Sequence, residues 1–291
     1  MNRPGNRSPL KTSVIAAVLV IPALFLLCVA ALHLVPDELI EGRLKEAAGE
    51  AGVAFTRKSF GKAFPFGIEL RAVEVFGNGG TRLVLLDRVR ARVNPLSLFA
   101  GRLTAYIDGD AGDGGFTGYA ILRPSGVGSL TVEARGVDLR YLPVLSRSSV
   151  KINGLIDARV SLGRVGAGCP EGAVSIKGYR IESSEVKVMG YPLPLGPIES
   201  AGGQVEMKDC KALIDGLWIE GKDLSARLRG EITAIRTPLA QSPVELTIEI
   251  TPKGGLVNKE YMLSLLSDFR KSANFYSIPV KGTIGAPVFV R

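Results

Sequence analysis

Few residues of this chain have the type and spacing that chemistry requires. Its single histidine, His33, stands in a long apolar run, and no histidine follows it. Ser-His-Asp or Cys-His catalysis and histidine-bearing zinc sites need side chains that the rest of the chain lacks. The phosphate-binding motif G-x-x-x-x-G-K-[ST] is absent, and no pair of carboxylates stands out for glycosidase chemistry. The sequence therefore predicts a non-enzymatic protein with no catalytic, cofactor-binding or metal-binding residues.

Two cysteines, Cys169 and Cys210, lie beyond the apolar run. No histidine stands near them, so their spacing does not match a metal site. An oxidising compartment permits them to form a disulfide, and the alternative is two separate, half-buried thiols. We expect the disulfide, because exported regions rarely keep a free thiol pair.

The apolar run extends from Val14 to Val35 and is the only one of its length in the chain. About 20 apolar residues in a helix cross the hydrocarbon core of a bilayer, so this run can span a membrane once. Basic residues stay on the cytoplasmic side of a membrane. The basic residues Arg3, Arg7 and Lys11 precede the run. Their position predicts a cytoplasmic N-terminus, with the bulk of the chain on the other side of the membrane.

A cleaved signal peptide is the alternative for this segment. Its apolar centre would be shorter, about 7–15 residues, and would end at a small-x-small site. We therefore expect an uncleaved anchor at residues 12–35, with residues 1–11 as a cytoplasmic tail. The run contains no carboxylate partner for His33, so we expect that side chain at the outer interface and not in a proton site.

Beyond the anchor, the sequence predicts one short helix and then a long series of strands. Residues 36–51 form the predicted juxtamembrane helix, because apolar residues recur at helical spacing within Asp37–Glu50. Over residues 52–291 the period changes to two, which puts the apolar side chains of each strand on one face. The clearest alternating segments are residues 88–93, 130–135, 156–162, 224–229 and 244–250.

Glycine-rich segments between these strands predict hairpin turns, since Asn-Gly and Asp-Gly supply positive φ angles. The expected turns are Gly77-Asn78-Gly79-Gly80, Asp108-Gly109-Asp110, Gly112-Asp113-Gly114-Gly115, Asn153-Gly154, Gly202-Gly203 and Asp215-Gly216. Short helical pieces are expected at Asn94–Ala100 and Asn258–Arg270, and a long loop at Tyr191–Pro197. Strands joined by hairpins indicate an antiparallel meander.

The predicted fold class is mainly β: a transmembrane helix followed by a curled antiparallel sheet with a few short helices. A sheet with one apolar face must cover that face. It can do so as a dry sandwich, or it can curl into a half-pipe whose open lining holds acyl chains. In both cases Arg88, Arg90 and Arg92 form a basic stripe on the solvated outside, a candidate contact for anionic head groups or a partner.

Composition agrees with an exported, folded domain beside a membrane. Apolar residues make up 46% of the chain, which is enough to bury a core. The net charge is +8, and basic residues close to anionic lipid favour its surface. No basic run is interleaved with aromatic residues and no recognition motif is present, so we expect no nucleic-acid partner.

Five segments occur in an order that carries a resemblance: RLKEAAGEAGVAFTRKSF (43–60), FPFGIELRAVEV (64–75), LVLLDRVRARVNPLSLFAGRL (83–103), GLWIEGKDLSARLRGE (216–231) and PVKGTIGAP (279–287). Together they resemble the AsmA-like family of anchored bacterial envelope proteins. Within that group, the chain length and single anchor are most similar to the type II secretion system protein N family, in the form that carries AsmA-like features.

This resemblance implies a single-pass protein of the bacterial inner membrane with its bulk in the periplasm. Its implied role is a non-enzymatic component of the type II secretion system that acts through contacts with other secretion proteins. The alternative is an AsmA-like protein that binds or transfers envelope lipids and holds phospholipid acyl chains on the apolar face. A purely structural envelope scaffold is a third reading, which the sequence does not separate from the first.

Overall fold

The structure is a computed structural model of the whole chain. It describes residues 34–50, 53–77, 80–123, 126–142, 152–165, 169, 171–183, 186–188, 191–193, 197–235, 241–254, 264 and 266–290. The expected cytoplasmic tail and nearly all of the expected membrane anchor lie outside these residues. Among the residues that are described, no helix is long and apolar enough to cross a membrane.

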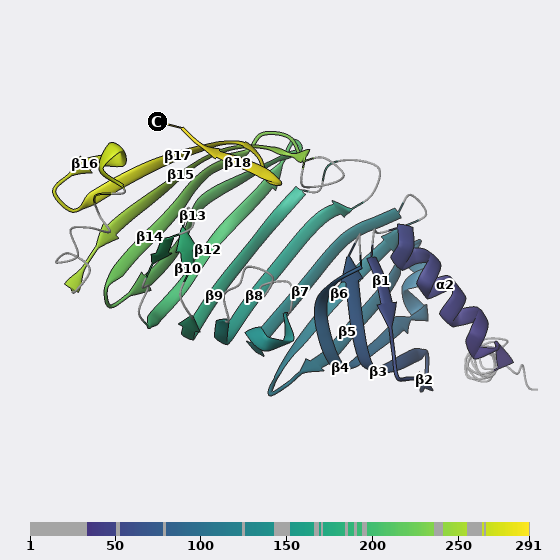
Figure 1. Ribbon diagram of the computed structural model, residues 1–291. Helices are drawn as coiled ribbons and strands as arrows, with labels where there is room; N and C mark the ends of the chain where they lie inside the picture. The colour runs from purple at the N-terminus through teal and green to yellow at the C-terminus, as the bar shows by residue number, and fades with distance from the viewer. Residues whose placement is uncertain are drawn as a thin grey trace, which may run out of the picture.

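One long antiparallel sheet makes up most of the described chain (Figure 1). It contains 16 strands and is not closed, because β1 and β2 lie at one edge and β16 and β18 at the other. Its strands are β1 (Val53–Thr56), β2 (Ser59–Ala63), β3 (Gly67–Gly77), β4 (Thr81–Asn94), β5 (Leu103–Ala111), β6 (Gly114–Arg123), β7 (Gly126–Asp138), β8 (Ile152–Val165), β9 (Glu171–Ser183), β12 (Ile198–Lys208), β13 (Lys211–Gly221), β14 (Leu224–Ile232), β15 (Pro243–Pro252), β16 (Arg270–Ser272), β17 (Phe275–Thr283) and β18 (Ala286–Phe289).

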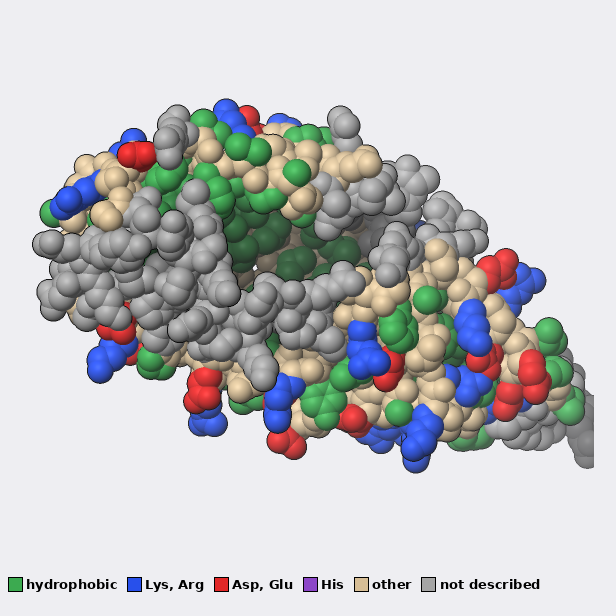
Figure 2. All heavy atoms as spheres, viewed as in Figure 1, with side chains coloured by type: hydrophobic (Ala, Val, Ile, Leu, Met, Phe, Trp, Pro, Cys, Tyr) green, Lys and Arg blue, Asp and Glu red, His purple; other side chains and the backbone are tan. Residues whose placement is uncertain are grey.

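The alternation of the sequence sets which face each strand presents. In β8, Val160 lies opposite Val132 of β7 and Val174 of β9, while Arg159 lies opposite Glu133. Directly opposed residues of antiparallel strands share a face, so apolar residues collect on one side and charged residues on the other. Figure 1 shows that the sheet is curved along its length, and the apolar side chains line its concave face in Figure 2. The expected mainly β meander is confirmed.

Several glycine pairs that predict turns instead lie inside strands. Asp108-Gly109-Asp110 belongs to β5, Asn153-Gly154 to β8, Gly202-Gly203 to β12 and Asp215-Gly216 to β13. The last three coincide with shifts in strand register, where the glycines adopt φ of +148°, +155° and +115°. A β-bulge uses the same conformational freedom of glycine as a turn does, and it bends the strand instead of reversing it.

The other expected turns lie between strands. Gly112 and Asp113 separate β5 from β6. The amide of Gly80 donates to the carbonyl of Gly77 over 3.1 Å between β3 and β4. Residues 78 and 79 of that segment lie outside the described chain.

The short elements follow the sequence in part. Helix α2 spans Asp37–Glu50, with Ile40, Leu44 and Ala48 half-buried on one side, which confirms that helix. A 3₁₀ turn, η1 (Pro95–Ala100), follows Asn94, whose side chain accepts from the amide of Leu96. The expected loop at Tyr191–Pro197 is wrong in part, because β11 (Tyr191–Leu193) pairs with β10 (Val186–Val188). Most of the expected helical piece Asn258–Arg270 lies outside the described residues. Its described helical part is η5 (Ser267–Phe269).

The structure decides between a sandwich and an open curved sheet. Within the described chain, every strand contacts chiefly its hydrogen-bonded neighbours, and the only sheet besides the large one is the two-stranded pair β10–β11. Of the two forms that the sequence allows, the described strands adopt the open curved sheet and not the sandwich. Register explains this outcome, because each long strand pairs with the next in sequence and none crosses over to form an opposing layer.

Candidate functional site

The concave face presents an uninterrupted row of apolar residues across twelve strands, from β3 to β17. Each member lies directly opposite the next in the sheet register. We call it the central row: Ile68, Ala91, Ile107, Gly118, Val132, Val160, Val174, Val205, Ile214, Gly230, Leu246 and Val280. Neighbouring strands lie about 4.8 Å apart, so the row extends for about 50 Å along the curved sheet. No charged or hydrogen-bonding side chain interrupts it.

A second row runs beside the first with the same character. Starting at β4 it contains Val93, Ala105, Ala120, Leu130, Leu162, Gly172, Met207, Ala212, Ile232 and Val244. The two rows make the concave face an apolar surface at least two residues wide. Figure 2 shows this surface as a hollow lined by hydrophobic side chains.

The middle of this face is not packed like a protein core. Val132, Val160 and Val174 are half-buried, and Ile176, on the same face of β9, is 42% exposed. Among described residues, no element packs over these four side chains in a hydrophobic core cluster. A contiguous exposed apolar surface of this kind typically marks a ligand or an interaction site.

Apolar clusters cover the face in two other places. Near the C-terminal edge, Leu266 and Phe269, which lie beside and within η5, pack on a group of buried residues of β14, β15 and β17: Leu224, Ile250, Tyr276 and Ile278. In the second cluster, Leu139 of η2 (Leu139–Tyr141) packs with Ile181 and Ile198. These clusters hold the curved sheet in shape and leave the stretch around Val160 open among the described residues.

The convex face carries ion pairs between neighbouring strands. Arg88 pairs with Asp110 at 2.8 Å and Arg92 with Asp108 at 2.7 Å, both across β4 and β5. Arg90 pairs with Glu69 of β3 at 2.7 Å. The expected basic stripe thus lies on the outside of the sheet, and each of its guanidinium groups has a carboxylate partner. An anionic ligand at this stripe would have to compete with those carboxylates.

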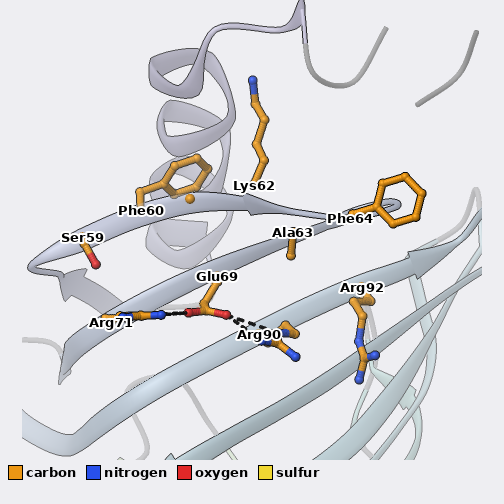
Figure 3. Close-up of a pocket in the computed structure, with 10 residues that line it drawn as sticks. Ser59, Phe60, Lys62, Ala63, Phe64, Glu69, Arg71, Arg90 and Arg92 are labelled. Atoms are coloured by element: carbon orange, nitrogen blue, oxygen red, sulfur yellow. Dashed lines mark hydrogen bonds and ion pairs between the residues drawn. The ribbon is translucent and has the colours of Figure 1, made fainter. Parts of the chain in front are cut away.

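Glu69 joins two arginines in one of these groups. Its carboxylate accepts hydrogen bonds from Arg90 and from Arg71, at 2.7 and 2.8 Å. Hydrogen bonds from Arg90 and then Arg71 hold the pKa of the Glu69 carboxyl below its ordinary value of 4.5. Glu69 and these two arginines line an open pocket of about 520 Å³ between β2, β3 and β4, together with Lys62, Phe64 and Arg92 (Figure 3).

We expect the Glu69→Gln variant to reduce the acid sensitivity of the fold. Because folding lowers the pKa of Glu69, its contribution to the free energy of unfolding is present above pH 4.5 and is lost as the pH falls through the folded pKa. Thermal unfolding midpoints of wild type and variant, measured between about pH 7 and about pH 3, check this. The variant should start lower at neutral pH and converge with the wild type in acid; parallel curves would contradict the assignment.

Cys169 and Cys210 meet at one end of the strands. Cys169, between β8 and β9, and Cys210, at the β12–β13 turn, form a disulfide with their Cα atoms 4.7 Å apart. That separation is within the usual range for disulfides. The bond ties the end of the β8–β9 hairpin to the end of the neighbouring β12–β13 hairpin, half-way along the strand order of the sheet. It does not lie on the open apolar face.

The acidic partners of the arginine stripe were not foreseen from sequence. Glu69, Asp108 and Asp110 stand on strands before and after β4, and only the register brings them opposite the arginines. The one signal in the sequence is that they alternate with apolar residues, which places them on the polar face. Among the described residues, no group of His, Cys, Asp and Glu is arranged to hold a metal ion.

Comparisons of this chain with models of protein families, with curated proteins and with solved structures find no match.

Proposed function

We propose that the concave face binds the acyl chains of lipids. The observation that carries this proposal is the central row, which is about 50 Å long, free of polar side chains and only half-buried around Val160. The hydrocarbon core of a whole bilayer is about 30 Å thick, so a single acyl chain fits along the row with room to spare. Burying apolar surface supplies the affinity, at about 25 cal/mol per Å².

The chemistry of this face favours an acyl chain over a peptide. The backbone groups of β6 to β9 already hydrogen-bond to neighbouring strands, and the central row adds no donor or acceptor. A peptide lying there would have to bury its own amide groups without partners, at a cost of about 1–3 kcal/mol each. A hydrocarbon chain has no such groups to satisfy.

The proposal includes a place in the cell. The apolar run Val14–Val35 and the basic residues before it support a chain anchored in a membrane with the sheet outside the cytoplasm. The resemblance to AsmA-like proteins supports the bacterial inner membrane and the periplasm. In that setting the ligand is a phospholipid of the cell envelope, and the function is to bind or transfer it.

A second candidate function has one observation in its favour. Tyr106 of β5 and Tyr119 of β6 lie directly opposite each other on the convex face and are 46% and 41% exposed. Tyrosine is enriched at protein interfaces, so this pair fits the implied role as a non-enzymatic component of type II secretion that works through protein contacts. Deleting the gene separates the candidates: a secretion component is needed for release of folded substrates, and a lipid-binding protein for normal envelope lipids.

Retention of lipid by the purified full-length chain tests the main proposal. We expect Val160→Asp to reduce the lipid that copurifies with the protein, because a carboxylate in the central row repels an acyl chain. Arg159→Asp is the matched control on the opposite face of the same strand. Both variants keep the anchor, so lipid around the anchor contributes equally. Lipid is counted by mass spectrometry after extraction.

Circular dichroism shows whether both variants remain folded. The structure places Val160 where it is only half-buried, so we expect the sheet to tolerate the new carboxylate. Equal lipid content in the folded Val160→Asp and Arg159→Asp variants would contradict binding on the concave face.

A further inference from the structure

Exposed apolar side chains gather where α2 begins and where β2 and β4 end. Phe64, in the β2–β3 turn, is 72% exposed, and Leu96, in η1 after β4, is 66% exposed. Leu34, three residues before α2, and Leu39, in its first turn, are 82% and 62% exposed. Exposed leucines and phenylalanines are costly in water when several share one end of a domain, and they are typical of surfaces that meet a membrane.

Contacts between these segments place them at the same end of the strands. The amide of Val93 donates to the carbonyl of Phe66 over 2.8 Å, which holds the end of β4 beside the β2–β3 turn. Lys62, two residues before Phe64, donates to the carbonyl of Val35 over 2.5 Å and pairs with Asp37 at 3.0 Å. Residue 35 therefore lies at the β2–β3 turn.

The basic pocket of Figure 3 opens at this end. Four cations line it, namely Lys62, Arg71, Arg90 and Arg92. Three carboxylates pair with them: Asp37 with Lys62, Glu69 with Arg71 and Arg90, and Asp108 with Arg92. Glu69 is shared by Arg71 and Arg90, so this group of ion pairs keeps one positive charge in excess. Figure 3 shows Phe64 at the tip of the turn, pointing away from the strands, with Arg92 on the adjacent strand.

The length of chain before this end indicates what it meets. The apolar run of the sequence finishes at Val35, and its length fits one crossing of a bilayer. The contact between Lys62 and the Val35 carbonyl puts the pocket and the four exposed apolar side chains where such a helix would leave the membrane. Positive charge and exposed apolar residues together match the interface of an anionic bilayer.

We propose that this end of the sheet docks on the surface of an anionic phospholipid bilayer. Phe64 and Leu96 enter the interface, while the phosphates of the head groups compete with Asp37, Glu69 and Asp108 for Lys62, Arg90 and Arg92. Docking of this end would keep the curved sheet at the membrane from which lipid would enter its concave face. The inference assumes that residues 12–35 anchor the chain, and it does not depend on what occupies the concave face.

Tryptophan quenching by brominated phospholipids tests the docking with the full-length chain in vesicles. The chain has one tryptophan, Trp218 of β13, so Phe64→Trp is made together with Trp218→Phe to leave a single reporter in the turn. We expect strong quenching when the vesicles contain brominated phosphatidylcholine with phosphatidylglycerol, and weaker quenching with brominated phosphatidylcholine alone. The wild-type chain, whose reporter is Trp218 far along the sheet, should show little quenching in both.

Arg92→Gln in the same background tests the charge. A basic residue near an anionic surface changes the ratio of docked to undocked protein about fivefold, so this variant should lower the quenching in phosphatidylglycerol vesicles. Arg229→Gln on β14 removes the same charge from a distant ion pair and should not. Absence of quenching at position 64 would overturn the docking, and quenching that ignores both phosphatidylglycerol and Arg92 would overturn the anionic contact.

Discussion

The Ile278→Asp variant should lose most of the stability of the fold. Ile278 on β17 is 3% exposed and packs in the C-terminal cluster with Ile250, Leu266 and Phe269. A carboxylate there loses its hydration without gaining a partner, and removal of the isoleucine also leaves a cavity worth about 2–5 kcal/mol. Since a whole domain is stable by about 5–15 kcal/mol, the change should shift the urea midpoint by a large fraction or prevent folding.

The control for this prediction is Thr247→Asp on the neighbouring strand. Thr247 lies on the convex face, opposite Arg229 of β14, so the new carboxylate is solvated and close to a positive charge. We expect its effect on the free energy of unfolding to be within about 0.5 kcal/mol. Similar losses in the two variants would mean that the C-terminal cluster is not the packed part of the concave face.

The second large effect is expected at Gly230 in β14. Its φ is +132°, and a Cβ atom there would lie 2.1 Å from the carbonyl oxygen of Glu245 on β15. Gly230→Ala must therefore strain its own backbone and push β15 away. Each of these costs about 1–3 kcal/mol, so we expect the free energy of unfolding to fall by about 2–6 kcal/mol, as measured by urea titration.

Gly61 in β2 supplies the matched control. Its φ is not in the positive range, and a Cβ atom there has nothing within 4 Å. Gly61→Ala should be neutral or should stabilise by up to about 1 kcal/mol, because alanine restricts the unfolded chain. An equal loss at Gly61 and Gly230 would show that strand glycines are sensitive for a reason other than positive φ and close approach of the neighbouring strand.

The faces of the strands could be predicted from the sequence because a period of two has only one structural consequence. Val160 and Arg159 on β8 point to opposite sides, as alternation requires. The register could not be predicted in the same way. The apolar patterns of β7, β8 and β9 allow several pairings, and only the assembled sheet brings Val132, Val160 and Val174 into one row.

Glycines were the main source of error, for a physical reason. Gly109 lies between two aspartates and has the local sequence of a tight turn, yet it sits inside β5. A Cβ atom there would lie 2.5 Å from the ring of Phe116 on β6, so glycine is needed to make room for a neighbour. A turn, a bulge and a close approach all select glycine, and the neighbour that distinguishes them is distant in sequence.

Coverage of the apolar face was likewise beyond the sequence. A sandwich and an open groove share the same alternation, and they differ only in whether late strands fold back on early ones. Here every long strand pairs with its successor, so the sheet extends and curves. The arginine stripe was placed correctly on the outside, but its neutralisation by Asp108, Asp110 and Glu69 depends on that same register.

Photo-crosslinking along β8 in living cells tests lipid binding on the concave face most directly. A photoreactive amino acid is placed in turn at each position from Asp157 to Ser161 of the full-length chain, and crosslinked phospholipid is detected after irradiation. The structure predicts lipid adducts at Ala158 and Val160, whose side chains face the hollow, and none at Asp157, Arg159 and Ser161. Adducts without this alternation, or no lipid at Ala158 and Val160, would contradict an acyl chain on the concave face.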